Sequence, residues 1–269
     1  MNLLWAGGDR RMLMLRTLLA KRGHQVQTLG LVEGDEEHHD PTKADALLFA
    51  YPFSVKNGSV PTLTGVDIRP EKVLASAPSG VPVMVGRGLE EWRFAKRYEQ
   101  CQPFLKQNAE LSAEAAVFEV MLRADRALMD LRILITGYGL FGRAIALKLR
   151  ALGAAVRIAA RRKEVLHQAE TDGMETCLLE RVGERLADVD FVLNTVPAPI
   201  FRENELRKMS GGTWLMELAS APYGFDRELA AALGLNAVLL PGLPARYAPC
   251  SAAMALASAV EELLREEAE

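Results

Sequence analysis

The feature that most constrains this chain is a glycine-rich turn set between an apolar run and a helical pattern. Residues 131–136 are mostly branched and apolar, as in a buried parallel strand. A turn with G-x-G-x-x-G spacing follows, an amphipathic run continues to Gly153, and a second apolar run covers 154–160. This strand–turn–helix–strand context is that of a dinucleotide-binding fingerprint. The sequence therefore predicts a Rossmann-type β-α-β unit here.

Each glycine of the turn has its own predicted task. Gly137 permits the tight turn, Gly139 lets the backbone approach a pyrophosphate, and Gly142 lets the helix pack closely on the strand. The N-terminus of that helix presents free N–H groups to the phosphates. We therefore assign the whole turn to cofactor binding: Gly137, Tyr138, Gly139, Leu140, Phe141 and Gly142.

The end of the second apolar run indicates which cofactor is bound. NAD sites usually place an acid there to hold the ribose 2′-hydroxyl. Here the run ends in Arg161 and Arg162, with no acid before Glu164. Two guanidinium groups can bind a 2′-phosphate bidentately, whereas an acid would repel it. The pattern favours NADP over NAD, with a solvated basic helix start as the alternative interpretation.

Composition limits the classes of partner. The 269-residue chain is 49% hydrophobic and 25% charged, and its net charge of −3 favours neither nucleic acid nor an anionic membrane. It shows no apolar run of membrane-spanning length and no signal-peptide pattern. Cys101, Cys177 and Cys250 are few and widely spaced, which fits a reducing cytoplasm and predicts no metal site.

The N-terminus repeats the central pattern 130 positions earlier. The shift superimposes Gly7 on Gly137 and Gly23 on Gly153, so two Rossmann-like halves are expected. In the first copy Asp9 replaces the second glycine and Met12 the third. An acid at the closest approach to a pyrophosphate is electrostatically unfavourable, so this half is predicted to face the substrate instead of the dinucleotide.

Substrate contacts are expected near the first helix and the next strand end. Arg10 and Arg11 begin that helix, where its dipole already favours an anion. A carboxylate site and two plain surface arginines are equally consistent with this placement. Ser54 lies in a polar loop, residues 51–58, after a buried strand, where open α/β sheets bind ligands.

A helix over residues 112–129 is predicted to join the halves. Ser112 fits an N-cap, and apolar residues recur after it at helical spacing. Glu114, in its first turn, either complements the helix dipole or contacts substrate. Both residues are kept as candidate substrate contacts.

The second nucleotide-binding half supplies the remaining candidates. Thr195, Val196 and Pro197 follow a strand and form a stiff loop assigned to the cofactor. Two further strand ends contribute the candidate catalytic residues and two candidate substrate contacts, namely Glu217 with Ser220, and Arg246 with Tyr247. For Glu217 the sequence leaves an acid–base role open beside a structural pairing with an arginine, and favours the latter. A guanidinium at Arg246 can clamp a carboxylate or lie on the surface.

These patterns together predict an α/β protein with two Rossmann-like domains, each a mainly parallel sheet flanked by helices, joined by long interdomain helices. The expected division is a substrate-side domain over 1–110, an NADP-binding domain over 111–245, and a C-terminal helix over 246–269 that returns to the first domain.

The combination of motifs resembles the A-subunit family of dipicolinate synthase, nearly end to end. The likeness is carried by runs beginning at Gly7, Ser112, Gly137, Asn194, Glu217 and Pro241. It implies NADP-linked oxidation of a dihydrodipicolinate-type cyclic dicarboxylate to dipicolinate in the mother cell of a spore-forming bacterium. It also implies that the partner is a flavoprotein-like B subunit, and a homo-oligomer is a further expectation.

Two positions depart from the family pattern, and rival interpretations stay open. Cys250 stands where the family has lysine, and Tyr223 replaces the first glycine of a Gly-Gly pair. A D-2-hydroxyacid dehydrogenase needs a late histidine, and none follows His167. A non-catalytic NADP-binding subunit or sensor, or another NADP-dependent oxidoreductase of a small carboxylate, is the alternative.

Overall fold

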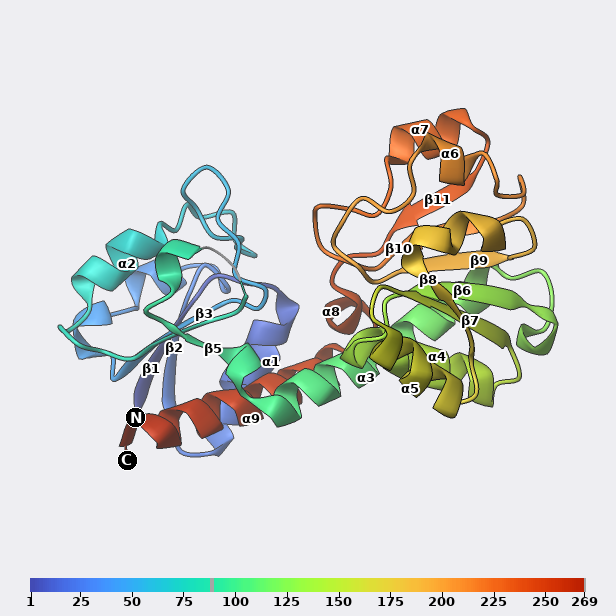
Figure 1. Cartoon of the computed structure of the whole chain (residues 1–269). Helices are drawn as coiled ribbons and strands as arrows, with labels where there is room; N and C mark the ends of the chain where they lie inside the picture. The colour runs from blue at the N-terminus through green and yellow to red at the C-terminus, as the bar shows by residue number, and fades with distance from the viewer. Residues whose placement is uncertain (88–89, 269) are drawn as a thin grey trace. The chain divides into compact units, whose positions relative to one another are not determined.

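The structure, a computed structural model, describes residues 1–87 and 90–268. The chain forms two compact units (Figure 1, coloured by residue number). Unit 1 comprises Met1–Asn108 and Pro244–Glu269, and unit 2 comprises Ala109–Leu243. Helix α3, Gln102–Arg123, contributes residues to both. The predicted class of two α/β domains with parallel sheets is confirmed.

Unit 1 is built on a five-stranded parallel sheet with the order β2-β1-β3-β4-β5. Its strands are β1 (Asn2–Ala6), β2 (Gln25–Leu29), β3 (Ala46–Phe49), β4 (Val83–Val85) and β5 (Lys96–Arg97). Its main helices are α1 (Arg10–Lys21), α2 (Pro70–Ser76) and α9 (Pro249–Ala268), with α8 (Leu243–Tyr247) just before the last. This strand order is the flavodoxin-like variant of the doubly wound sheet.

The core of unit 1 follows the two-residue period of its strands. In β1, Leu3 and Trp5 pack into the cluster that contains residues of α1 and α9, while Leu4 and Ala6 pack into the cluster on the other face. Helices α1 and α9 lie side by side in Figure 1 and make many contacts. The C-terminal helix therefore returns to the unit that holds the N-terminus.

Unit 2 carries a six-stranded parallel sheet with the order β11-β10-β9-β6-β7-β8. Its strands are β6 (Arg132–Thr136), β7 (Ala155–Ala160), β8 (Glu175–Leu178), β9 (Phe191–Asn194), β10 (Trp214–Glu217) and β11 (Asn236–Leu239). The helices between them are α4 (Leu140–Ala151), α5 (Lys163–Thr171), α6 (Glu203–Leu206) and α7 (Arg227–Ala232). Counted within the unit, this is the dinucleotide-binding order 3-2-1-4-5-6.

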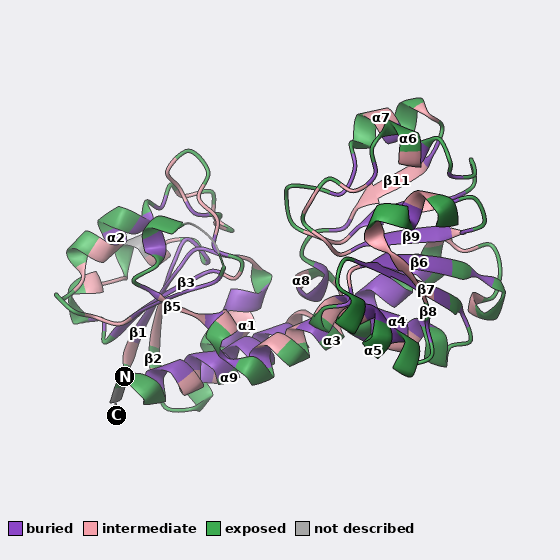
Figure 2. Cartoon of the chain, in the orientation of Figure 1, coloured by how far each residue is buried: buried purple, intermediate pink, exposed green. Residues whose placement is uncertain are grey.

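The central strands of unit 2 are buried on both faces, as Figure 2 shows for β6, β7 and β9. The strand order reverses between β6 and β9, so a crevice opens outside the carboxyl ends of these two strands. Residue 136 ends β6 and residue 194 ends β9, so the glycine turn and the loop at Thr195 meet at this point. The topology thus brings together two segments that the sequence separates by nearly sixty residues.

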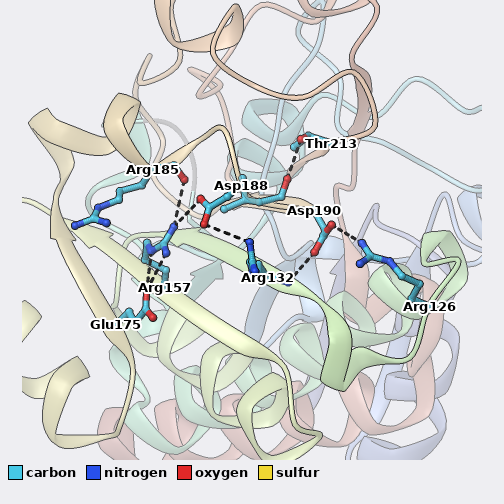
Figure 3. Close-up of polar contacts among 9 residues, drawn as sticks. Arg126, Arg132, Arg157, Glu175, Arg185, Asp188, Asp190 and Thr213 are labelled. Carbon is cyan, nitrogen blue, oxygen red and sulfur yellow. Dashed lines mark hydrogen bonds and ion pairs between the residues drawn. The ribbon is translucent and has the colours of Figure 1, made fainter.

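A separate polar network closes the amino ends of the same strands (Figure 3). Arg157 of β7 donates to Glu175, its register partner on β8, and to Asp188 at 3.3 Å. Asp190 accepts from the Arg132 backbone N–H at 2.8 Å and from Arg126 at 2.5 Å. These bonds tie strand ends together at the edge opposite the glycine turn, so we assign this network to stability.

One predicted boundary is wrong. The helix expected over 112–129 begins ten residues earlier, at Gln102, and ends at Arg123, so Ser112 lies inside α3 and does not cap it. Pro103 is the second residue of α3, a place where a helix tolerates proline because the first-turn N–H groups have no intrahelical partner. Within residues 1–87 and 90–268, no helix is long and apolar enough to cross a membrane.

Candidate functional site

The candidate site of unit 2 is a pocket of about 400 Å³ at the carboxyl ends of β6, β7 and β9. Its walls come from the glycine turn, the end of β7, helix α5 and the loop after β9. The lining residues are Gly137, Tyr138, Gly139, Ala159, Ala160, Arg161, Arg162, Val165, Leu179 and Val196. The structure thus gathers the predicted glycine, arginine and valine positions around one cavity.

The glycine turn has the geometry that phosphate binding requires. Gly137 adopts φ +86° and donates its N–H to the Ala159 carbonyl at 2.9 Å. Gly139 is the N-cap of α4, and an added Cβ there would meet nothing within 4 Å. At Gly142 an added Cβ would lie 2.4 Å from the Gly137 carbonyl oxygen. The turn is therefore tightly packed at Gly142 and open at Gly139, where a pyrophosphate would lie against the helix N-terminus.

The three apolar residues of the turn divide between pocket and surroundings. Tyr138 lines the pocket, and its hydroxyl donates to Asp172 Oδ2 at 2.8 Å. Arg143 donates to the same oxygen at 2.7 Å, and these bonds hold the pKa of Asp172 at about 2. The Tyr138 ring is thereby fixed to one side of the turn. Leu140 is exposed, and neither it nor Phe141 lines this pocket among the described residues.

The two predicted arginines lie at the end of β7. Both are exposed and both line the first pocket; Arg162 is also the N-cap residue of α5. Arg161 lines a second, adjoining pocket of about 700 Å³ as well. A 2′-phosphate bound at this strand end would meet two guanidinium groups and no carboxylate from the first pocket's lining.

Sequence reasoning missed most of the second pocket. Besides Arg161 it is lined by Leu178, Leu179, Glu180, Val182, Pro199, Ile200, Arg202 and Glu205. These residues come from the end of β8 with the 3-10 segment that follows it, and from the loop and helix after β9. No motif marks them, since the sheet topology alone brings the two segments to the same edge.

The loop after β9 begins with the predicted cofactor residues. The Thr195 hydroxyl donates to the Thr136 carbonyl at 2.6 Å, so it links the ends of β9 and β6. Val196 lines the first pocket and Pro197 is exposed beside it. An added Cβ at Gly137 would lie 2.7 Å from Thr195 Oγ1, so this loop packs directly on the glycine turn.

Glu217 is buried at the end of β10, with 1% of its surface exposed. Its Oε1 accepts from Asn194 Nδ2 at 2.7 Å and its Oε2 accepts from the Gly224 N–H at 2.7 Å. Burial raises the pKa of Glu217, and these hydrogen bonds oppose that rise. The expected arginine partner is replaced by neutral N–H donors. Ser220, the other candidate catalytic residue, is exposed on the following loop.

In unit 1 the equivalent turn is closed by its own chain. The Gly8 N–H donates to the Pro61 carbonyl at 2.7 Å, and an added Cβ at Gly7 would lie 2.6 Å from Val60. Asp9 caps α1 by accepting from the Arg11 N–H. A carbonyl oxygen and a carboxylate thus occupy the side of the turn that a pyrophosphate would need, which supports the prediction that this half does not hold the dinucleotide.

The two arginines at the start of α1 differ sharply. The Arg11 side chain is 5% exposed; it donates to both Asp9 oxygens and to the Tyr51 carbonyl. Its guanidinium is therefore engaged within unit 1, in place of the open position expected for substrate binding. Arg10 is exposed, and Ser54 is half-buried in the loop after β3.

The other candidate substrate contacts are distributed over both units. Ser112, which is buried, and Glu114, which is exposed, lie on the part of α3 that belongs to unit 2. Arg246 and Tyr247 lie on α8 in unit 1, with the Arg246 guanidinium 5.3 Å from the centre of the Tyr247 ring. Arg246 and Arg10 therefore belong to the same unit. Across residues 1–87 and 90–268, no cluster of His, Cys, Asp and Glu could hold a metal ion.

Comparisons with known proteins identify a dinucleotide-binding domain in this part of the chain. The family model for the NAD-binding domain of D-isomer specific 2-hydroxyacid dehydrogenases matches residues 104–239. The A subunit of dipicolinate synthase from Bacillus subtilis (strain 168) is 31% identical over 155 residues, which are 58% of this chain and 52% of that protein. The chain therefore matches about half the length of this relative.

Solved structures extend the likeness to the whole fold. The crystal structure of the dipicolinate synthase A subunit from Bacillus halodurans has a TM-score of 0.88 and 26% identity, covering 98% of this chain and 97% of that one. A D-isomer specific 2-hydroxyacid dehydrogenase from Lactobacillus delbrueckii ssp. bulgaricus, complexed with NAD, has a TM-score of 0.59 and 14% identity over 98% and 96% of the chains. The resemblance to the A subunit of dipicolinate synthase is confirmed, and the chain carries a nicotinamide dinucleotide-binding domain.

Proposed function

The chain belongs to the D-isomer specific 2-hydroxyacid dehydrogenase family through its NAD-binding domain, and from that premise we propose that this NAD(P)-dependent oxidoreductase converts a dihydrodipicolinate-type cyclic dicarboxylate to dipicolinate. The observation that carries the proposal is the likeness to the dipicolinate synthase A subunit, which covers 98% of the chain. A fold alone would support only the broader class.

We further propose NADP as the preferred cofactor. The open glycine turn at Gly139 fits a pyrophosphate, because the N-terminus of the twelve-residue helix α4 faces it and no side chain fills it. Arg161 and Arg162 then supply two cations where a 2′-phosphate would lie. The loop at Thr195 and Val196 borders the same pocket and limits where the nicotinamide end can go.

The proposed chemistry requires little from the protein beyond binding and orientation. When bound, NADP supplies the hydride acceptor, and the dihydropyridine loses a hydride and a proton to become aromatic. The chain's residues must hold two carboxylates and exclude misaligned poses. Arg10 and Arg246, whose guanidinium lies 5.3 Å from the centre of the Tyr247 ring, are the candidate cations for the carboxylates. The Arg11 guanidinium binds Asp9 and the Tyr51 carbonyl.

The cellular setting enters the proposal by resemblance. We place the protein in the cytoplasm of the mother cell of a spore-forming bacterium, where it acts with a flavoprotein-like B subunit. A homo-oligomer is also part of the proposal. Copurification with the B subunit tests the partnership, and measurement of the mass in solution tests the homo-oligomer.

The test is a direct assay of nicotinamide reduction with the dihydrodipicolinate precursor. We expect NADPH to form from NADP and NADH to form more slowly from NAD, and we expect the Gly139→Ala variant to lose the activity. The assay is run with and without a B subunit. If the purified protein binds NADPH yet reduces no nicotinamide in either condition, the catalytic proposal is wrong and a non-catalytic NADP-binding subunit becomes the better description.

A further inference from the structure

The loop of residues 195–201 borders the pocket at the glycine turn and the adjoining pocket of about 700 Å³. Val196 lines the pocket at the glycine turn, and Pro199 and Ile200 line the adjoining one. The loop follows β9 and precedes α6, and it has no regular structure of its own apart from a bridge at Phe201. Its conformation must therefore be fixed by contacts at its two ends if the pockets are to keep their shape.

Asn194 holds the first end. Its Nδ2 donates to the Val196 carbonyl at 2.9 Å, and its Oδ1 accepts from the Val196 N–H at 3.2 Å. The Thr136 hydroxyl donates to the same Oδ1 at 2.5 Å. Asn194 is fully buried, so its amide has no water to replace these partners.

Gly224 holds the second end. Its carbonyl accepts from the Ile200 N–H at 2.9 Å and from the Phe201 N–H at 2.8 Å. The neighbouring residue Phe225 forms a parallel bridge with Phe201. Residue 224 must lack a side chain, because an added Cβ would lie 2.3 Å from Asn194 Nδ2.

Glu217 joins these two supports. One carboxylate oxygen accepts from Asn194 Nδ2 and the other from the Gly224 N–H, each at 2.7 Å, and Ala219 N–H adds a third bond at 3.0 Å. We propose that Glu217 is a positioning residue that holds the cofactor loop, residues 195–201, through Asn194 at one end and Gly224 at the other.

The geometry distinguishes this role from acid–base catalysis. Both oxygens of Glu217 face N–H donors of its own unit, and the side chain is 1% exposed. A general acid or base must come within hydrogen-bond reach of the reacting proton. A carboxylate can accept three such bonds, whereas an amide presents one acceptor oxygen and an NH₂ group that would face a donor. Position 217 therefore requires glutamate, because its carboxylate accepts hydrogen bonds from three N–H donors.

The same arrangement accounts for one departure from the family pattern. Tyr223 stands at the first position of the Gly-Gly pair and is exposed. Gly224, the second position, is buried against Asn194. Only the second glycine is needed by the contacts of Glu217.

The inference rests on dinucleotide binding, which the proposed function shares, and not on the identity of the carboxylate substrate. The test is Glu217→Gln, which keeps the shape and alters the acceptors. We expect the dissociation constant for NADPH, measured by its fluorescence, to rise about tenfold, the scale of one lost charged hydrogen bond. At saturating cofactor, kcat should stay within about threefold of the wild type, because the reacting groups are untouched. Glu228→Gln, on the surface of α7, is the matched control.

Two outcomes would overturn the proposal. A large loss of kcat with unchanged NADPH affinity would make Glu217 an acid–base residue. A lower melting temperature with unchanged NADPH affinity would make it a purely structural one. Because NADPH binding needs no substrate, a protein that binds NADPH but never oxidises dihydrodipicolinate refutes the proposed function and leaves this test intact.

A measurement on the wild-type protein covers the case in which Glu217→Gln does not fold. The amides of Ile200 and Phe201 donate to Gly224, so we expect both to be protected from hydrogen exchange before any cofactor is added. Exchange of these amides at the rate of an open loop, slowed only by NADPH, would show that the loop is not held in advance and would contradict the proposal.

Discussion

Asp9 and Gly139 occupy the same structural position in the two units: each is the N-cap of the helix that follows the first strand. The Asp9 carboxylate satisfies its own helix by accepting from the Arg11 N–H, whereas Gly139 has no side chain and leaves the N-terminus of α4 open. Together with the Pro61 carbonyl that accepts from Gly8, the Asp9 carboxylate closes the N-terminus of α1 to a phosphate, whereas the N-terminus of α4 stays accessible.

The two later glycines of the fingerprint should separate binding from folding. Gly139→Ala places a methyl group in open space, so we expect the free energy of unfolding to fall by no more than about 1 kcal/mol, the cost of alanine at an N-cap, while the dissociation constant for NADPH rises at least tenfold, roughly 1.4 kcal/mol. Gly142→Ala drives a methyl group against the Gly137 carbonyl and should also lower stability by about 1–3 kcal/mol. Urea melts and NADPH titrations of both variants check this; equal stability losses would contradict it.

Arg161→Ala should change cofactor preference more than cofactor binding as such. Loss of one guanidinium at the proposed 2′-phosphate position is expected to raise the dissociation constant for NADPH about tenfold or more and that for NADH less than about threefold. Titration of both cofactors measures the ratio. Arg181→Ala, which removes an exposed arginine paired with Glu184, is the control. If the dissociation constant for NADH rises as much as that for NADPH, Arg161 does not bind the 2′-phosphate.

The paired arginines of α1 should behave differently. Arg11→Ala removes a 5% exposed guanidinium from Asp9 and Tyr51, and we expect a loss of about 1–2 kcal/mol, since Asp9 itself stays 44% exposed. Arg10→Ala should leave the melting temperature unchanged and raise the KM for dihydrodipicolinate. An Arg10→Ala enzyme with normal KM would remove Arg10 from the proposed substrate site.

The loss of folding stability at low pH should depend in part on Asp172. Hydrogen bonds from Arg143 and Tyr138 lower the pKa of Asp172 from 3.8 to about 2. The carboxylate is therefore favoured in the folded state, and the stability it contributes is present above pH 3.8 and lost as the pH falls towards 2. Thermal melts of Asp172→Asn should show a shallower decline over this interval than the wild type, whereas Asp125→Asn, at an exposed carboxylate, should not.

Local pattern predicted local structure well. The 130-position shift holds in detail, since Gly7 donates to Leu29 and Gly137 donates to Ala159 in the same register. The start of α3 is misplaced in the prediction because serine is a common N-cap residue, whereas Ser112 lies inside a helix that already begins at Gln102. Burial of Arg11 has no local signal either, because its partner Tyr51 is forty residues away in the chain.

Strand order was beyond the reach of local pattern. The third strand of unit 1, β3, pairs with β1, whereas the third strand of unit 2, β8, pairs with β7. Both arrangements satisfy the same alternation of strands and helices, and only the packing of the whole sheet selects between them. The second pocket and the hydrogen bonds of Glu217 with Asn194 and Gly224 depend on that strand order. No spacing in the sequence therefore indicates them.

The Pro61 carbonyl that faces Gly8 has a thermodynamic consequence. In unit 1 a carbonyl of the chain itself accepts from the turn, so we expect the folded state of this unit to gain no stability from dissolved nucleotide. Unit 2 keeps an unfilled turn, and mass action should stabilise it by about 2.7 kcal/mol when free cofactor exceeds its dissociation constant a hundredfold. Under the proposed function, we therefore expect bound cofactor to slow the unfolding and proteolysis of unit 2.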